Sequence, residues 1–402
     1  MSVYKSKIIA GIEIGTGKVS VLLGEIVEGR SLNIIGKGQC SSHGVLKGDI
    51  VDFHETRDCV HAATMAAQNQ ARVKVDGVYL AVSGTHIEGY ASVASVNPTG
   101  EQGRVIEEDL KQVTRIAEDR ELPENRTIIH NLRRPYLLDG RVVGSPVGMQ
   151  GDQLEASFWS VHGDARKLSD AIHVINGFNL HVDDVILSGI ASSAAVTTDE
   201  ERRSGVLVID IGGGTTDYAL YAHGKCMIAG ALPIGGDHIS NDISIGMRMR
   251  LKQAESLKIR YGSAVVEHLD KSEKVWMNNE VEIGDRPISL WSLEKIIELR
   301  TEEIFEVVLK KLGGLYRADK LGAGVVLCGG SASLRNVGQC ASKVFEAGVR
   351  LGDNANMAQG ELKDSQYSTA LGLLHYGLIT QNENGPSSRP RGIWGKLKGL
   401  LQ

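Results

Sequence analysis

Apolar and polar positions in the first 84 residues follow the pattern of a small α/β unit. Apolar residues dominate 8–14, 18–27 and 32–38, and glycine-containing turns separate these three runs, which predicts three successive strands. Apolar positions at helical spacing over 52–70 predict a helix, and the apolar run 78–83 predicts a further strand. The chain therefore begins with an antiparallel sheet onto which a helix returns.

A different pattern occupies residues 85–163. Ile106, Leu110, Val113 and Ala117 share one face of a predicted amphipathic helix over 105–120. Strand-like runs at 87–96, 127–131 and 154–161 surround this helix, with prolines between them. We interpret this segment as an α+β insertion that interrupts the first unit.

Alternation of helices and strands resumes at residue 164. The pattern predicts a helix over 164–178, a strand over 182–187 and a helix opening at Ser188, whose small residues are matched by a second small-residue run at 368–372. Helical residues at 254–262 and a short strand at 281–284 follow. Ser292 is the expected cap of a long helix ending at Lys311, with Glu294 in its first turn.

One glycine-rich hairpin has the composition of a phosphate-binding turn. The strand 206–211 leads into it, and its turn residues are Gly212, Gly213, Gly214, Thr215 and Thr216. Backbone N–H groups and threonine hydroxyls in such a turn form a concave set of donors that suits a phosphate. Asp210, at the end of the first strand, could hold a hydrated Mg²⁺ against it. The alternative is an ordinary glycine-rich hairpin.

A second copy of this plan stands near the N-terminus. Glu13 occupies the position of Asp210, and the turn residues are Gly15, Thr16, Gly17 and Lys18. Two such copies almost half a chain apart predict a duplicated domain that holds a ligand between its halves. The turn is not a Walker loop, because Ile12 and Val19 stand where that loop needs glycine and a hydroxyl. Lys18 is either a phosphate contact or a surface lysine.

A third motif combines a buried-type strand over 324–328 with Gly329, Gly330 and Ser331. The glycines would let a flat ring approach the backbone, and Ser331 is expected to open a helix whose N-terminus favours an anion.

In this order and spacing, the three motifs resemble the phosphate and adenosine motifs of the actin-like ATPases, a superfamily that includes actin, heat-shock chaperones and sugar kinases. Within it, the chain is similar over nearly its whole length to the FtsA family of bacterial cell-division proteins. The resemblance implies an α/β, actin-like (ribonuclease-H-like) two-lobed fold with an inserted α+β subdomain and a C-terminal amphipathic helix. It implies subdomain 1A at 1–84 and 164–188, 1C at 85–163, 2A at 189–234 and 305–379, 2B at 235–304, a linker at 380–391 and a membrane helix at 392–402.

The resemblance also implies ATP and Mg²⁺ as cofactors, with Glu13 and Asp210 as catalytic and metal-binding carboxylates. Gly236, Glu255 and Lys258 would contact the nucleotide, although Glu255 and Lys258, three residues apart, could equally form an ordinary surface ion pair. Many relatives position the attacking water with an acidic or amide side chain that residues 187–195 lack. We therefore expect at most a slow ATPase whose nucleotide state acts as a switch.

The C-terminal residues have the pattern of a membrane-binding helix. A polar linker with prolines and serines covers 380–391, and the apolar residues beyond it cluster within about 120° of a helical wheel. Lysines flank that arc, as an interfacial helix on anionic lipid requires. The alternative is a helix that docks on the protein itself or on a partner. The residues concerned are Ile393, Trp394, Lys396, Leu397, Lys398, Leu400 and Leu401.

The partners implied by the resemblance follow from these parts. The chain would form actin-like protofilaments, recruit later division proteins through its insertion, and tether FtsZ filaments to the cytoplasmic face of the inner membrane at the division site. Arg286, Lys295 and Arg300 are candidate contacts for the FtsZ C-terminal tail.

Composition excludes several other classes of protein function. The 402 residues carry a net charge of −5, which argues against a general nucleic-acid surface, and no run of 18 apolar residues occurs. The five cysteines and twelve histidines show no metal-ligand spacing. A sugar kinase would have no use for the tail, and a chaperone would carry a peptide-binding domain after the ATPase. An actin-like adaptor of another envelope assembly, such as pili, stays open.

Overall fold

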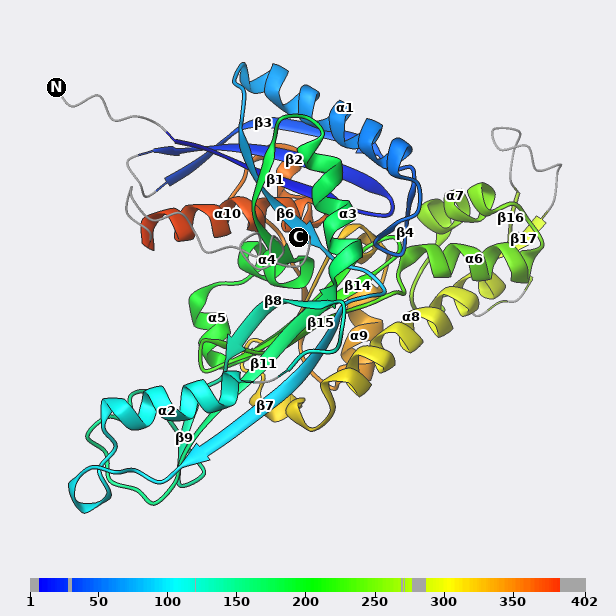
Figure 1. Ribbon diagram of the computed structural model, residues 1–402. Helices are drawn as coiled ribbons and strands as arrows, with labels where there is room; N and C mark the ends of the chain where they lie inside the picture. The colour runs from blue at the N-terminus through cyan, green and yellow to red at the C-terminus, as the bar shows by residue number, and fades with distance from the viewer. Residues whose placement is uncertain are drawn as a thin grey trace.

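Two five-stranded sheets of the same topology form the centre of the molecule (Figure 1). The computed structural model describes residues 7–27, 31–119, 121–268, 270, 272–276 and 287–383. The first sheet has the order β12-β6-β1-β2-β3, in which β1–β2 and β2–β3 are antiparallel while β1–β6 and β6–β12 are parallel. Its strands are β1 (Lys7–Ile14), β2 (Lys18–Val27), β3 (Ser31–Ser41), β6 (Gly77–Val82) and β12 (His181–Leu187).

The second sheet, of order β15-β14-β13-β18-β19, repeats this arrangement, because two antiparallel pairs are again followed by two parallel ones. The internal duplication predicted from the two glycine hairpins is therefore present in the fold. The strands are β13 (Val206–Ile211), β14 (Thr216–Ala222), β15 (Lys225–Leu232), β18 (Val325–Cys328) and β19 (Val349–Leu351).

Helices cover the first sheet on both faces. The helices α1 (Phe53–Ala71) and α3 (Ala165–Asn176) lie on one face, and α10 (Ser368–Glu383) packs against β1 and β2 on the other (Figure 1). The helix α4 (Ser188–Val196) packs on α10 and on the second sheet, and the short α5 (Asp199–Ser204) follows it. The predicted small-residue runs are thus the crossing point of α4 and α10. A Cβ added to Gly372 would lie 1.7 Å from the carbonyl oxygen of Ala191.

The insertion builds a sheet and a small core of its own, as expected. It extends away from the two lobes in Figure 1, with α2 (Glu107–Glu118) packed against β7 and β11. Its base rests on the second lobe, where Trp159 Nε1 donates to the Ala229 carbonyl at 2.7 Å and Arg134 Nε donates to the Met227 carbonyl at 2.7 Å. The strands are β7 (Glu88–Val96), β8 (Arg126–Arg133), β9 (Tyr136–Leu138), β10 (Arg141–Val143) and β11 (Leu154–Asp164).

A fourth part comprises α6 (Gly236–Met247), α7 (Leu251–Tyr261), α8 (Leu290–Leu312), β16 (Lys274–Trp276) and β17 (Pro287–Ser289). The expected cap of the long helix was wrong by three residues. Ser289 caps α8, because its Oγ accepts from the N–H of Ser292 at 3.3 Å. Glu294 is consequently beyond the first residues of the helix, and it is fully buried. The predicted strand at 281–284 and the candidate contact Arg286 lie outside the described residues.

The predicted helix at Ser331 was also wrong. Residues Gly330–Ser333 form a single 3-10 turn, and α9 (Val337–Phe345) begins only after Asn336, whose φ is 59°. The intervening residues turn toward the end of α7, where the Arg335 carbonyl accepts from the N–H of Ala264 at 2.8 Å.

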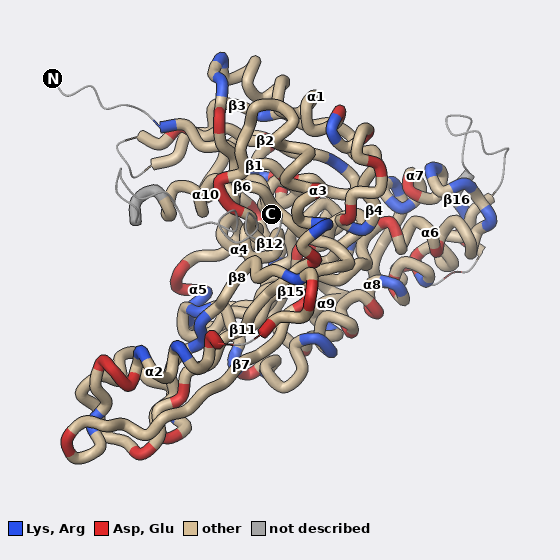
Figure 2. Tube along the Cα trace, in the orientation of Figure 1, with Lys and Arg blue, Asp and Glu red and all other residues tan. Residues whose placement is uncertain are grey.

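The remaining short elements lie in connections. The strands β4 (Val45–Leu46) and β5 (Asp49–Ile50) form a hairpin between β3 and α1. Further 3-10 turns occupy Glu101–Gly103, Gly313–Leu315, Ala318–Lys320, Gly360–Lys363 and Ser365–Tyr367. Positive and negative residues are interspersed along the elements (Figure 2). No helix in the described part of the chain is long and apolar enough to cross a membrane.

Candidate functional site

The two glycine hairpins meet at the edge of one cavity of about 460 Å³, which lies between the lobes. Gly15 and Gly213 both line it. A Cβ added to Gly213 would lie 3.6 Å from the Gly17 nitrogen, and one added to Gly214 would lie 2.4 Å from Thr16 Oγ1. The hairpins are therefore in direct contact, and Gly214 has no room for a side chain.

Both turns are closed by the same internal hydrogen bond. The N–H of Gly15 donates to the Lys18 carbonyl at 3.0 Å, and the N–H of Gly212 donates to the Thr215 carbonyl at 2.9 Å. The helix α6 starts on the second turn, since the N–H groups of Gly236 and Asp237 donate to the carbonyls of Gly212 and Gly213 at 3.0 and 2.9 Å. The structure thus brings the predicted turn residues of both copies to one cavity, with the exception of Thr216. Thr216 is fully buried outside the cavity lining, and its Oγ1 donates to the Ile234 carbonyl at 2.7 Å.

Five carboxylates line the same cavity, and three of them, Glu13, Asp210 and Asp217, belong to the two hairpins. Burial raises the pKa of Glu13 from 4.5 to about 7, with Lys18 opposing that shift and Asp210 adding to it. Burial also raises the pKa of Asp210, and burial together with the neighbouring Asp210 raises that of Asp217 well above its ordinary value. In the ligand-free protein the charged form of all three groups is therefore disfavoured, chiefly by burial.

A hydrated divalent cation fits this wall. Glu13 Oε2 and Asp217 Oδ1 are buried and have no hydrogen-bond partner, and a buried acceptor left unpaired is costly. Within the described ranges, no three His, Cys, Asp or Glu side chains converge closely enough to hold a bare ion. Water and phosphate oxygens would have to complete the coordination shell, which is the usual arrangement for Mg²⁺.

Asp217 is a site residue that the sequence analysis missed, although it directly follows the predicted turn residues, as the second residue of β14. A signal for it existed. Counting outward from the middle of the turn pairs Ile211 with Thr216 and Asp210 with Asp217, and the structure has this register. The second carboxylate is thus fixed beside the first by the hairpin itself.

Lys18 is partly buried in the cavity wall and does not lie on the outer surface. Its ammonium donates to the carbonyl and to Oε1 of Gln366 at 2.7 and 3.1 Å and stands 4.2 Å from the centre of the Tyr367 ring. Burial is the main reason why the pKa of Lys18 is lowered. Gln366, which also lines the cavity, gave no signal in the sequence.

The other end of the cavity is formed by Gly236, Glu255, Lys258 and the loop after β18. Lys258 Nζ lies 2.7 Å from Glu255 Oε2 and donates to the Gly236 carbonyl at 3.0 Å, so this ion pair belongs to the cavity wall. A Cβ on Gly329, whose φ is +87°, would collide with Asp210 Oδ1. A Cβ on Gly330 would meet no atom within 4 Å, which leaves space beside the backbone for a flat ring. Ser331 Oγ donates to the Gly212 carbonyl at 2.9 Å.

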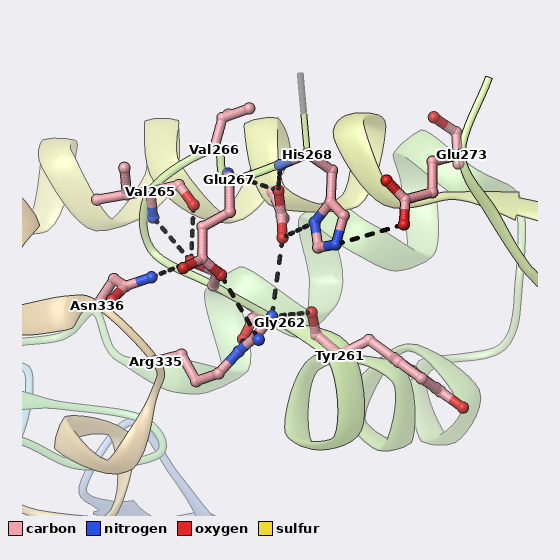
Figure 3. A network of polar contacts seen from close by, with 12 residues as sticks. Tyr261, Gly262, Val265, Val266, Glu267, His268, Glu273, Arg335 and Asn336 are labelled. Atoms are coloured by element: carbon pink, nitrogen blue, oxygen red, sulfur yellow. Dashed lines mark hydrogen bonds and ion pairs between the residues drawn. The ribbon is translucent and has the colours of Figure 1, made fainter. Parts of the chain in front are cut away.

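Arg335 ties that loop to the end of α7 (Figure 3). Its guanidinium donates to the carbonyls of Gly262 and Tyr261 at 3.2 Å each and lies 3.7 Å from Glu294 Oε1. The buried Glu294 carboxylate accepts from the N–H of Glu267 and His268 at 2.9 and 3.0 Å. The loop after β18 and the part of the molecule that contains α6, α7 and α8 are therefore joined by one polar network.

The candidate partner contacts on α8 are engaged within the protein. Lys295 Nζ lies 2.6 Å from Glu298 Oε2, and Arg300 pairs with Asp242 at 2.5 Å and with Glu303 at 2.6 Å. The membrane-helix residues 392–402 lie outside the described part of the chain.

Comparisons with known proteins agree with this arrangement. Residues 207–372 match the family model "Cell division protein FtsA", and residues 84–162 match "SHS2 domain inserted in FTSA". The cell division protein FtsA of Escherichia coli (strain K12) is 33% identical over 386 residues, which cover 92% of this chain and 90% of that protein.

Two solved structures show the same fold at low identity. The PilM-PilN type IV pilus biogenesis complex aligns with a TM-score of 0.62 and 14% identity over 92% of this chain and 98% of the other. MreB5 of Spiroplasma citri bound to ADP aligns with a TM-score of 0.53 and 16% identity over 94% and 99%. The duplicated lobes are thus those of the actin-like fold. With two matching family models and a third of its residues identical to a curated relative, the chain belongs to the FtsA family of cell-division proteins.

Proposed function

We propose that this protein binds ATP with Mg²⁺, polymerises in actin-like fashion, and tethers FtsZ filaments to the cytoplasmic face of the inner membrane at the division site, where it helps to recruit later division proteins. The observation that carries the proposal is one cavity to which both glycine hairpins with their carboxylates Glu13, Asp210 and Asp217, and a glycine-rich loop, contribute.

The cavity supports ATP as the ligand. The hairpin turns at Gly15 and Gly213 offer backbone N–H groups and hydroxyls to phosphates. Glu13, Asp210 and Asp217 would hold the waters of Mg²⁺, which offsets phosphate charge when bound. The open space beside Gly330 would take the adenine, while Glu255 and Lys258 would contact the ribose and ring.

Turnover would be slow, and nucleotide state would act mainly as a switch. Burial and the neighbouring Asp210 raise the pKa of the cavity carboxylate Asp217 well above its ordinary value. Ser83 Oγ donates a hydrogen bond to this carboxylate at 2.8 Å. A carboxyl held in this way is a weak general base until a cation restores its charge. Steady turnover above about 1 s⁻¹, within the range of ordinary enzymes, would contradict a switch.

The C-terminal sequence supports attachment to a membrane. Its apolar stripe and lysines suit an interfacial helix. The conformational entropy that this short glycine-containing segment loses when it becomes helical offsets much of the free energy with which one copy binds the membrane. Polymerisation places many tails on one surface and would turn weak binding into stable attachment.

The test is co-sedimentation of the full chain with anionic liposomes, with and without ATP and FtsZ, beside a variant lacking residues 392–402. We expect ATP to increase sedimentation of protein and of FtsZ, and the truncated variant to leave both in solution. Equal sedimentation of the truncated variant would refute the membrane assignment.

A pilus-type adaptor is the alternative, since the PilM-PilN complex shares the fold. Failure of FtsZ to co-sediment, with membrane binding intact, would favour it. A sugar-kinase-like phosphotransferase is the less favoured reading, and phosphoryl transfer from ATP to a sugar would be its signature.

A further inference from the structure

The short hairpin β4–β5 is clamped between the two phosphate turns and the base of the insertion. The N–H of Gly48 donates to Thr16 Oγ1 at 3.1 Å, and Gly48 lines the cavity. A Cβ added to Gly214, on the second turn, would lie 2.9 Å from Lys47 Cα. This hairpin therefore contacts the phosphate turns of both lobes, although it belongs to none of the three sequence motifs.

Other contacts fix the hairpin from behind. A Cβ added to Gly48 would lie 2.7 Å from Gly84 Cα, where the insertion begins. Asp49 accepts from Lys167 Nζ on α3 at 2.6 Å and from the Thr85 hydroxyl. The hairpin is thus a fixed part of the cavity edge, and its two-residue turn is the part that faces the cleft.

The residue at the tip of this turn is unexpected. Lys47 has a φ of 51° and Gly48 a φ of 79°, so both turn residues are in the left-handed region. Glycine and asparagine are the usual residues there, and a long side chain is disfavoured. A disfavoured conformation that the surrounding contacts enforce is a common mark of functional sites.

The Lys47 ammonium is also available. Among the residues that the structure describes, no hydrogen bond or ion pair involves this side chain, which is partly exposed. Lys18, by contrast, is already held by Gln366. The positive charge of Lys47 acts across the cleft on His238 of α6. The pKa of His238 is lowered mainly by burial and, next, by the charge of Lys47. The lysine lies next to the cavity wall on a flexible four-carbon stem that could turn inward.

We propose that the β4–β5 turn is a third phosphate loop, in which Lys47 contacts the terminal phosphate of the nucleotide and joins the two lobes through it. This inference rests on the proposed binding of ATP. Lys47 would make the protein bind a triphosphate more tightly than a diphosphate, because only the triphosphate has the phosphate that it contacts. The diphosphate, held deeper between the glycine turns, would not need this residue.

The test measures the affinities of MgATP and MgADP for the full chain and for Lys47→Gly. Glycine suits the left-handed turn, so the variant should be at least as heat-stable as the parent protein, which separates a lost contact from a damaged fold. We expect the ATP affinity to fall about tenfold or more, as for loss of a hydrogen bond to a charged group. We expect the ADP affinity to change less than about threefold, and Lys47→Arg to retain most of the ATP affinity.

The matched control is Arg72→Gly, which also removes a cation from a left-handed position, with φ 55°, but at the C-terminal end of α1. It should leave both affinities unchanged. If the parent protein bound ATP and Lys47→Gly lost no more ATP affinity than ADP affinity, the role of Lys47 would be refuted while ATP binding stood. If the parent protein bound neither nucleotide, the proposed function itself would be refuted.

Discussion

Ser83 and Asp217 join the two lobes, since Ser83 Oγ at the end of the first sheet donates to Asp217 Oδ2 in the second at 2.8 Å. Both residues line the central cavity, and the insertion begins directly after Ser83. The bond satisfies one oxygen of Asp217, while Oδ1 stays buried and unpaired. The Asp217 carboxylate therefore lies where the cavity, the contact between the lobes and the base of the insertion meet.

Replacing Asp217 by asparagine should raise the stability of the ligand-free protein and weaken its response to Mg²⁺. An amide removes a buried charge that the site disfavours, as the raised pKa of Asp217 indicates. Loss of a carboxylate beside a metal site commonly costs about 10–100-fold in metal affinity. Calorimetry of MgATP binding and thermal unfolding without ligand would check both effects.

Asp319→Asn, on an exposed 3-10 turn, is the control. It loses only an exposed ion pair with Arg317, which contributes little to stability, and it should leave the MgATP affinity unchanged. Equal MgATP affinities of Asp217→Asn and the parent protein would show that Asp217 does not serve the cation.

The contribution of Glu13 to the stability of the ligand-free protein should fall as pH rises from about 4.5 to about 7. Burial raises the pKa of Glu13 from 4.5 to about 7, so the folded protein holds a proton that the unfolded chain has released. Stability from this group is complete below pH 4.5 and lost as pH passes 7. The loss is at most about 3 kcal/mol, from about 1.4 kcal/mol per pKa unit, and is reduced by solvent in the open cavity.

Urea unfolding of the parent protein and of Glu13→Gln between pH 4.5 and 8 would measure this contribution as the difference between the two pH profiles. His86 and His130, whose pKa values burial lowers to about 4, affect both proteins alike. MgATP should reduce the difference by favouring the charged Glu13 carboxylate. Parallel pH profiles of Glu13→Gln and the parent protein would contradict the assignment.

Gly372→Ala should be strongly destabilising, although glycine is normally a weak helix residue. The added Cβ would lie 1.7 Å from the Ala191 carbonyl oxygen, so α10 would have to move away from α4. Overpacking of this kind costs about 1–3 kcal/mol or more. Chemical denaturation would measure the loss.

Gly338→Ala in α9 is the matched substitution, because its Cβ would meet only Val349 Cγ1 at 3.8 Å. There the usual preference for alanine should stabilise the helix by about 0.5–1 kcal/mol. Equal effects at both glycines would show that the α4–α10 crossing is loose.

Reversing the charge of Arg300 alone should disturb the fold around α8, because Asp242 and Glu303 would then face a third carboxylate. A swap of Arg300→Asp with Asp242→Arg keeps the pair but exchanges its charges. If Arg300 contacts an FtsZ tail peptide, the swap should weaken peptide binding severalfold, as measured by fluorescence anisotropy. It should lower the melting temperature less than Arg300→Asp alone, because only the pair with Glu303 is lost. Unchanged binding would remove Arg300 from the candidate surface.

The sequence by itself determined the elements and the two turns. Strand and helix periodicities identified β1–β3, α1, β6, α3 and the insertion, because these patterns are local. The glycines and threonines of the two turns likewise predicted tight, phosphate-binding turns from local sequence. The register of the second hairpin implied that Asp217 lies beside Asp210.

Only the tertiary structure decided which of these local pieces meet. Gly15 and Gly213 share one cavity, Lys18 is held by Gln366, and Lys47 reaches the second lobe at Gly214. Ser289 replaced Ser292 as a cap, and Ser331 opened no helix, because contacts with distant segments set both ends. These contacts join residues that are far apart in the chain, so local sequence patterns do not predict them. The burial that follows from these contacts sets the pKa values of the site residues, so these also depend on the tertiary structure.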